Sequence, residues 1–209
     1  MRVGVLASGR GSNFEALERA CRVADSPARL VLLATDRGGA EVVVKARAAG
    51  LAVHVFDPGT RRGPWTGEAV QALLGTLAEQ RIEALCLAGF MRILPPELVR
   101  AYPGRILNVH PSLLPAFPGT HAQRQALAAG VKVAGCTVHL VDEGVDTGPI
   151  VLQATVPVLD DDTEDTLAAR VLEREHEIYP EALRALAEGR IRVDGRRARL
   201  LASAAARQA

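Results

Sequence analysis

The feature that most constrains this fold is an alternation, through the first half of the chain, of strand-like and helix-like stretches. Continuous apolar runs typical of buried strands lie at 2–8, 29–35, 51–56, 82–89 and 106–110. Stretches with the 3.6-residue period of a helix lie at 14–24, 40–50, 68–80 and 95–102. Neighbouring parallel strands need a long crossover, which is usually a helix. The alternation therefore predicts an α/β fold, a doubly wound and mostly parallel open sheet with helices on both faces.

The second half of the chain is richer in strands. Its predicted elements are a helix at 120–129, strands at 133–141 and 149–158, a long helical stretch at 160–189 and a hairpin at 191–201. Pro180 falls inside the long helical stretch, and we expect it to kink the helix or divide it. No internal repeat or linker separates domains, so we expect one domain over 1–209, with halves at about 1–100 and 101–209.

Composition and charge narrow the class of protein. The 209 residues are 48% hydrophobic, enough for a sizeable core. No apolar run approaches a membrane span, and MRVGVLAS is too short for a signal peptide, so we expect a cytoplasmic protein without a membrane partner. A net charge of +1, with both signs interspersed, argues against a nucleic-acid surface. Cys86 and Cys136 lie in apolar strand-like runs without CxxC spacing, which predicts buried, reduced thiols.

The segment SGRGSN (8–13) lies between the first predicted strand and the first predicted helix. Its glycines let the backbone approach an anion, and a helix N-terminus offers N–H groups and the positive end of the helix dipole. The third glycine of a dinucleotide fingerprint is replaced by Phe14, and no GxxxxGK[ST] motif occurs. These features favour a single phosphate monoester over NAD or ATP; a plain glycine-rich turn is the alternative. Arg61 and Arg62 could close over such a phosphate or could be solvated.

The segment ILNVHPSLLP (106–115) ends a predicted strand with an amide and an imidazole. Side chains alternate along a strand, so Asn108 and His110 point to the same face, and Pro111 places His110 at the strand's carboxyl end. Open α/β sheets bind their ligands at that edge. An Asn amide can donate to an oxyanion, and a His can transfer protons near neutral pH. A purely structural histidine is the alternative reading.

An acidic segment further along the chain could serve this histidine. VDEGVDTGP offers Asp142, Glu143 and Asp146 on one loop, and a nearby carboxylate would keep the His110 imidazole protonated. His139 lies on a neighbouring strand face and could line the same pocket. The histidines show no HxH or HExxH spacing, so no metal site is predicted.

Glu175 interrupts an apolar stripe on the predicted long helix. Leu167, Val171, Glu175 and Ile178 share one face of the helix by their spacing. A carboxylate on a buried face needs a partner, and an amine-bearing ligand would serve. The alternative is that Glu175 reaches solvent at the edge of the stripe.

Together these segments resemble the phosphoribosylglycinamide formyltransferases (GAR transformylases) of purine biosynthesis. SGRGSN, LAGFMRIL, LNVHPSLLPAFPG, VHLVDEGVDTGPI and EREHEIYP occur in the family's order and spacing over nearly the whole chain. HPSLLP with a downstream DTGPI marks enzymes that use formyltetrahydrofolate, and SGRGSN points to this family among them. The resemblance implies the formyltransferase fold, with a Rossmann-like, phosphate-binding N-terminal half and a folate-binding, catalytic second half. It implies transfer of a formyl group from 10-formyltetrahydrofolate to the amine of glycinamide ribonucleotide.

The resemblance also implies a role for each motif residue. The substrate-binding residues would be Gly11, Ser12, Asn13 and Arg62 at the phosphate and Glu175 at the ribose or glycinamide end. The folate-binding residues would be Met91, Arg92, Ile93, Leu94, Asn108, Asp142, Glu143, Gly144, Val145 and Asp146, with Arg92 near the glutamate tail. The loop around Arg62 departs from the family's pattern, so Arg61 remains an alternative.

The implied chemistry is a direct attack of the neutral amine on the formyl carbon. Asn108 and protonated His110 would stabilise the tetrahedral oxyanion. Asp146 would keep His110 protonated and, through water, help move the amine's proton toward the folate leaving nitrogen. No metal is required, and the expected partners are the two small-molecule substrates, with neither nucleic acid nor membrane. The oligomeric state stays open, a homodimer included.

Three other functions are alternatives to formyl transfer to glycinamide ribonucleotide. Formyltetrahydrofolate hydrolases share the site but usually carry an N-terminal regulatory domain, which we do not expect because the first predicted strand starts at Arg2. Methionyl-tRNA formyltransferases would need a further C-terminal domain and a basic RNA surface. A non-catalytic Rossmann-type nucleotide-binding module would use Asp36 for a ribose hydroxyl and would be indifferent to His110→Ala, but the missing third glycine argues against it.

Overall fold

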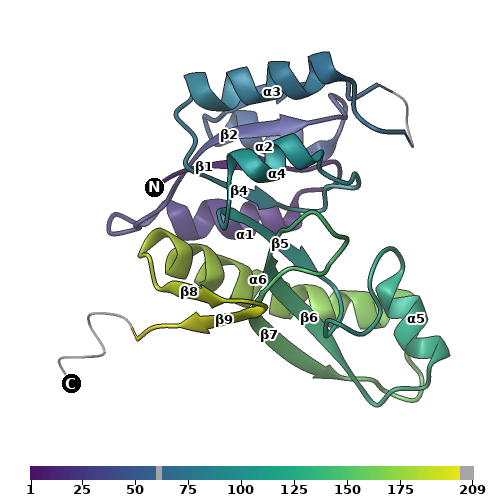
Figure 1. Ribbon diagram of the computed structural model, residues 1–209. Coiled ribbons are helices and arrows are strands. Elements are labelled where there is room, and N and C mark those ends of the chain that lie inside the picture. The colour runs from purple at the N-terminus through teal and green to yellow at the C-terminus, as the bar shows by residue number, and fades with distance from the viewer. Residues whose placement is uncertain (60–62, 203–209) are drawn as a thin grey trace. The chain divides into compact units, whose positions relative to one another are not determined.

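The chain forms two compact units, Met1–Asn108 and Val109–Ala209. The computed structural model describes residues 1–59 and 63–202 (Figure 1). The boundary between the units falls inside one strand, β5 (Ile106–His110). The prediction of a single domain stays a prediction.

The first unit is built on a parallel sheet. Its strands are β1 (Arg2–Leu6), β2 (Arg29–Thr35), β3 (Ala52–Val55), β4 (Ala84–Leu87) and the first part of β5. They lie in the order β3-β2-β1-β4-β5, and each neighbouring pair is parallel. The chain first moves outward from β1 to β3 and then crosses to β4 on the other side of β1. This reversal creates a switch point between β1 and β4, where open α/β sheets bind ligands beyond the carboxyl ends of the strands.

Helices follow the strands of the first unit in turn. They are α1 (Ser12–Cys21), α2 (Glu41–Ala48), α3 (Gly67–Glu79) and α4 (Pro96–Ala101). α1 contacts α2, and α3 contacts α4. Right-handed crossovers in opposite directions from β1 place these two pairs on opposite faces of the sheet (Figure 1). Local signals start the helices: the Thr66 hydroxyl accepts from Ala69 N at the N-cap of α3, and Pro96 occupies the first turn of α4.

The second unit combines a mixed sheet with one long helix. Its elements are α5 (Ala122–Ala128), β6 (Val133–Leu140), β7 (Ile150–Pro157), α6 (Glu164–Ala187), β8 (Ile191–Asp194) and β9 (Arg197–Leu200). β6 and β7 are antiparallel, β7 and β9 are parallel, and β8 and β9 form an antiparallel hairpin. α6 packs on β6 and β7. Its apolar face is buried there, with Leu167 and Val171 fully inaccessible.

The predicted mostly parallel open sheet with helices on both faces is confirmed. The predicted element boundaries differ from the observed ones by a few residues, mainly because the helices are shorter. Of the two expectations for Pro180, division of the long helix is wrong, because α6 runs unbroken through it, and a kink stays a prediction. A proline inside a helix costs about 3 kcal/mol, but the neighbouring Tyr179, Ala182 and Leu183 are almost completely buried. Burial of this face outweighs the lost hydrogen bond.

Two further expectations concern buried thiols and membranes. Cys86 and Cys136 are buried in β4 and β6 and form no disulfide, as predicted. Among the described helices, none combines the length and the apolarity that a membrane span requires.

Candidate active site

The glycine-rich segment forms the turn from β1 into α1. Gly11 is the N-cap of α1 with φ of 79°, in the left-handed region. A Cβ added at Gly11 would lie 2.8 Å from Cβ of Val42, and Val42 N donates to Gly9 O at 3.2 Å. The turn is therefore packed against the start of α2, and only glycine fits at position 11. No described side chain caps this end of α1, and a phosphate oxygen is the kind of acceptor that first-turn N–H groups bind.

Ser8 joins this turn to the segment that follows β4. Its hydroxyl donates to Asp36 Oδ1 at 2.7 Å and accepts from Met91 N at 3.4 Å. Its main-chain N–H donates to Gly89 O at 3.3 Å. The predicted phosphate turn and the predicted folate segment are thus neighbours at the switch point between β1 and β4. Asp36, the ribose ligand of the nucleotide-module alternative, accepts a hydrogen bond from Ser8.

The predicted folate segment Met91–Leu94 connects β4 to α4. It borders a hollow of about 750 Å³ whose other walls come from residues 63–71 and 95–97. The side chains of Met91 and Ile93 are 67% and 69% exposed, whereas Leu94 is buried. An apolar hollow with exposed apolar side chains at its rim suits a ring-bearing ligand. Arg62 and its alternative Arg61 lie outside the described residues.

In the second unit, His110 and Asp146 meet as the sequence predicted. His110 Nδ1 lies 3.3 Å from Asp146 Oδ2, and both side chains are largely buried. His110 Nε2 lies 2.9 Å from Phe117 O. A carbonyl oxygen only accepts, so Nε2 carries the proton of that hydrogen bond. Because the other ring nitrogen faces a carboxylate, a doubly protonated imidazolium satisfies both contacts.

Asp146 is the hub of this cluster. Its Oδ2 also accepts from Gly119 N at 2.8 Å, and its Oδ1 lies 3.6 Å from His139 Nε2. Burial alone would raise the pKa of the Asp146 carboxyl. The His139 ring, the Gly119 N–H and the charge of His110 outweigh burial, so this pKa lies below its ordinary value. The carboxylate is therefore ionised at neutral pH.

The groups that hold His110 have unusual backbone conformations. Phe117, whose carbonyl accepts from the imidazole, has φ of 54°, and Asp146 also has φ of 54°. The left-handed region is uncommon for residues other than glycine and is an outlier for a bulky one such as Phe. Such strain persists where surrounding contacts over-determine it, and it concentrates at functional sites.

A buried hydroxyl fixes the segment that follows His110. Thr137 Oγ1 donates to Ser112 O at 2.7 Å and accepts from Leu114 N at 3.0 Å. It also accepts from the Gln153 side-chain amide at 2.9 Å. Thr137 is completely buried on β6. This network ties the HPSLLP segment to the β6–β7 pair.

The acidic loop between β6 and β7 is shaped by local hydrogen bonds. Asp142 Oδ1 accepts from Gly144 N at 3.1 Å and from Thr147 Oγ1 at 2.7 Å, in an Asx-type turn. A Cβ at Gly148 would overlap the carbonyl oxygen of Leu140, so only glycine closes the loop there. The predicted folate residues 142–146 thus lie together on this loop.

Glu175 is buried, so the alternative that it reaches solvent is wrong. Its residue exposure is 6%, on the face of α6 that packs on β6 and β7. Its charge also acts on Cys136 of β6, whose pKa burial raises to about 12. Glu175 is therefore buried and lies close enough to Cys136 of β6 to act on its pKa.

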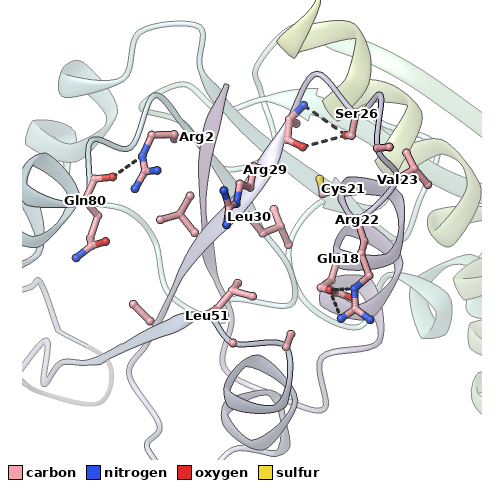
Figure 2. A pocket seen from close by; sticks show the side chains of 16 residues that line it. Arg2, Glu18, Cys21, Arg22, Val23, Ser26, Arg29, Leu30, Leu51 and Gln80 are labelled. Atoms are coloured by element: carbon pink, nitrogen blue, oxygen red, sulfur yellow. Dashed lines mark hydrogen bonds and ion pairs between the residues drawn. The ribbon is translucent and has the colours of Figure 1, made fainter.

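A second hollow, of about 710 Å³, lies at the opposite, amino edge of the first sheet (Figure 2). Arg2 Nε donates to Gln80 O at 2.9 Å, and Arg22 Nε donates to Glu18 Oε1 at 2.8 Å. Burial raises the pKa of Cys21 to about 11, so this thiol is protonated at neutral pH. Because these groups are engaged or unreactive and the edge is not the ligand edge, the candidate site is the carboxyl edge.

Sequence reasoning missed some participants in the site. His139 was only expected near the pocket, yet its ring contacts the same carboxylate as His110. The Phe117 carbonyl and the Gly119 N–H were missed entirely, because main-chain groups leave no signal in residue type. Among the described residues, no cluster of three or more His, Cys, Asp or Glu side chains could hold a metal ion. That no metal takes part stays a prediction.

Comparison with known proteins gives the following relatives. The family described as "Formyl transferase" matches residues 1–183. The chain is 42% identical over 185 residues to the phosphoribosylglycinamide formyltransferase of Bacillus subtilis, covering 88% of this chain and 94% of that protein. The solved structure of glycinamide ribonucleotide transformylase 1 from Symbiobacterium toebii is similar, with a TM-score of 0.91 and 49% identity, over 97% of this chain and 94% of that one.

Longer proteins are also similar. The chain is 47% identical over 195 residues to the trifunctional purine biosynthetic protein adenosine-3 of Drosophila pseudoobscura pseudoobscura, covering 91% of this chain. It spans 14–19% of the length of the trifunctional relatives from this fly, Drosophila melanogaster and Gallus gallus.

Proposed function

Since the chain belongs to the formyl transferase family, we propose that it transfers the formyl group of 10-formyltetrahydrofolate to the amine of glycinamide ribonucleotide. The observation that carries this proposal is the buried contact of 3.3 Å between His110 Nδ1 and Asp146 Oδ2. It lies within the two sequence segments that formyltetrahydrofolate-using enzymes share. The names of the Bacillus subtilis and Symbiobacterium toebii relatives support the acceptor.

The proposed reaction begins with attack by the neutral amine. Its lone pair forms a bond to the formyl carbon, and the carbonyl π electrons move onto oxygen to give an oxyanion. Asn108, two residues before His110 on β5, donates to this oxygen from its amide, and the imidazolium of His110 supplies positive charge. The oxyanion then reforms the carbonyl as the bond to the folate nitrogen breaks.

Proton transfer completes the exchange. The attacking nitrogen loses one proton and the leaving folate nitrogen gains one, so the protein contributes no net proton. We assign the relay to water held by Asp146, which is ionised because the pKa of its carboxyl is lowered. His110 faces this carboxylate on one side and the Phe117 carbonyl on the other, so its ring is held in place through the cycle.

The substrate ends are assigned by position. Gly11, Ser12 and Asn13 at the start of α1 would bind the ribonucleotide phosphate, as the uncapped helix end favours. Arg62, or Arg61, would assist from outside the described residues. Glu175 would meet the ribose or glycinamide end.

The folate pocket takes the remaining proposed residues, which are Met91, Arg92, Ile93, Leu94, Asn108 and the loop residues Asp142, Glu143, Gly144, Val145 and Asp146. Support comes from the apolar rim at residues 91–94 and from the closed turn at 142–147. We further propose a single formyltransferase domain in the cytoplasm that needs no metal, nucleic acid or membrane, with a homodimer open to measurement.

The proposal is tested by following release of deformylated folate by absorbance, with and without glycinamide ribonucleotide. We expect turnover only when the amine is present. His110→Ala and Asp146→Asn should each lower kcat by about 10²- to 10³-fold, the range for removing an oxyanion donor or a proton-transfer group. Folate release without the amine would identify a hydrolase. A folded protein without turnover would favour the nucleotide-binding module.

A further inference from the structure

Aromatic side chains gather beside the Met91–Leu94 segment. The chain contains one tryptophan and four phenylalanines in 209 residues. The ring of Trp65 stacks on Phe56, with centroids 5.0 Å apart and 29° between the planes. Phe90, the residue before the segment, lies 6.0 Å from Trp65 by ring centroids. Phe56 is buried, so Trp65 rests on a fixed support.

Hydrogen bonds join the tryptophan's loop to the segment in both directions. Trp65 Nε1 donates to Ile93 O at 3.0 Å. Arg92 Nη2 donates to Gly63 O at 3.2 Å. The segment has no regular secondary structure, so its main-chain groups depend on contacts of this kind for a defined shape.

The segment presents apolar side chains to the hollow. Met91 and Ile93 are more than two-thirds exposed on either side of Arg92, while Leu94 anchors the segment in the core. A shift of the Ile93 carbonyl would therefore move both exposed side chains relative to their anchor. Trp65 itself lines the same hollow.

We propose that Trp65 is a positioning residue that holds Met91–Leu94 in the shape that receives formyl folate, through its hydrogen bond to the Ile93 carbonyl. The inference rests on the proposed function. Trp65 acts through the segment and touches none of the reacting atoms. Losing the bond lowers the population of the binding-competent shape, which weakens folate binding without changing the chemical step.

The test compares Trp65→Phe with the wild-type enzyme in steady-state kinetics. Phe keeps a ring on Phe56 but has no N–H donor. We expect the KM for 10-formyltetrahydrofolate to rise about five-fold, the equivalent of one ordinary hydrogen bond. We expect kcat and the KM for glycinamide ribonucleotide to stay unchanged. The matched control is Tyr102→Phe, which also removes one polar group from an aromatic ring but does not line the hollow, and it should leave all three constants unchanged.

The sole tryptophan also gives a direct readout. The indole N–H of Trp65 produces the one tryptophan side-chain signal in a ¹H–¹⁵N spectrum of the wild-type protein. Titration with tetrahydrofolate should shift this signal saturably. The Trp65→Phe variant contains no indole and should lack the signal, which assigns the signal to Trp65.

The possible outcomes distinguish the role of Trp65 from the proposed function of the protein. An unchanged folate KM in Trp65→Phe, with wild-type turnover intact, would overturn the inference and leave the proposed function standing. Equal rises in both KM values, or the same rise in Tyr102→Phe, would show a general disturbance and would also overturn it. Wild-type protein without turnover would overturn the proposed function and the role of Trp65 with it.

Discussion

At the scale of single residues, the centre of the candidate site is an imidazole held by acceptors on both sides. His110 faces the Asp146 carboxylate and the Phe117 carbonyl. Both are hydrogen-bond acceptors, so each ring nitrogen of His110 has an acceptor within reach. His139 approaches the same carboxylate and adds to the donors around it. The Asp146 carboxylate thus lies beside both imidazole rings of the cluster.

The ionisation of Asp146 predicts how its variant responds to pH. A lowered folded-state pKa means that the carboxylate is charged above the ordinary value of 3.8, and its contribution disappears only as pH falls through the lower folded value. We expect Asp146→Asn to lower kcat throughout the range from about pH 5 to about pH 8, because the carboxylate is charged over that whole range. The pH profiles of both enzymes check this. A loss that vanishes toward the acid end of that range would contradict an ionised Asp146.

Thr137 gives a prediction on stability. Thr137→Val keeps the volume but leaves Ser112 O, Leu114 N and the Gln153 amide without their partner. We expect a loss of about 2–3 kcal/mol in the free energy of unfolding, measured by urea denaturation. Thr137→Ser keeps the hydroxyl and removes one methyl group, which should cost about 1 kcal/mol. A valine variant as stable as the serine variant would show that this network adds nothing.

Single residues were predictable from the sequence when a polar or charged side chain stood in an otherwise apolar stretch. Asn108 and His110 stand out at the end of an apolar strand, and Glu175 stands out on an apolar stripe. Thr137 did not stand out, because threonine is common in strands and its partners are main-chain groups distant in sequence. The role of His139 depends on the fold of the acidic loop, which one sequence does not reveal.

At the scale of elements, α6 is fixed at its start by a cluster around Asp162. Thr163 and Thr166 form a capping box at the helix N-terminus. Asp162 accepts from both terminal nitrogens of Arg170 at 2.8 Å, and its Oδ2 also accepts from Leu159 N at 2.8 Å. These bonds tie the end of the β7 connection to the second turn of α6.

The cluster predicts a pH-dependent stability. The hydrogen bond from Arg170, then that from Leu159 N, hold the pKa of the Asp162 carboxyl well below its ordinary value of 3.8. This stabilisation is fully present above the ordinary pKa and is lost as pH falls through the folded one. Asp162→Ala should therefore lower the Tm by the same amount at all pH values above about 5, and the difference should shrink below about 4.

Thermal unfolding followed by circular dichroism checks this prediction. Asp161→Ala removes a neighbouring exposed carboxylate and should leave the Tm nearly unchanged. A gap between wild type and Asp162→Ala that widens in acid would contradict the assigned sign.

Elements were the most predictable level of this structure. The apolar run at 29–35 coincides with β2, and the others lie within a few residues of their strands. Periodicity failed at helix ends, where the chain ends α1 at Cys21 although the apolar pattern continues. The division of the long helix at Pro180 was also wrong, because a rule about local hydrogen bonding takes no account of burial on β6 and β7.

At the scale of the whole molecule, the chain is an α/β protein with a net charge of +1. The parallel pairing of strands in the first unit followed from the alternation of strands and helices along the chain. The mixture of parallel and antiparallel pairs in the second unit did not, because alternating patterns leave the partner of each strand undetermined.

Both substrates should stabilise the folded protein. A ligand that binds only the native state at about 100 times its Kd adds about 2.7 kcal/mol. For a chain of this size, that raises the Tm by roughly 5–10 °C. Thermal shift with tetrahydrofolate and with glycinamide ribonucleotide checks this expectation. NAD serves as the control, and a rise with NAD alone would favour the nucleotide-binding module.

The left-handed backbone at Phe117 has a consequence for how this protein can change over generations. Position 117 offers its carbonyl to the imidazole, whereas position 146 offers its carboxylate. Substitutions at position 117 are then limited by the backbone conformation alone. Glycine or asparagine could replace phenylalanine there without disturbing the contact with the imidazole. At position 146, a substitution by an uncharged residue removes the negative charge of the carboxylate. The two residues that contact His110 are thus under different constraints. Position 117 is constrained in its backbone conformation, and position 146 is constrained in the charge of its side chain.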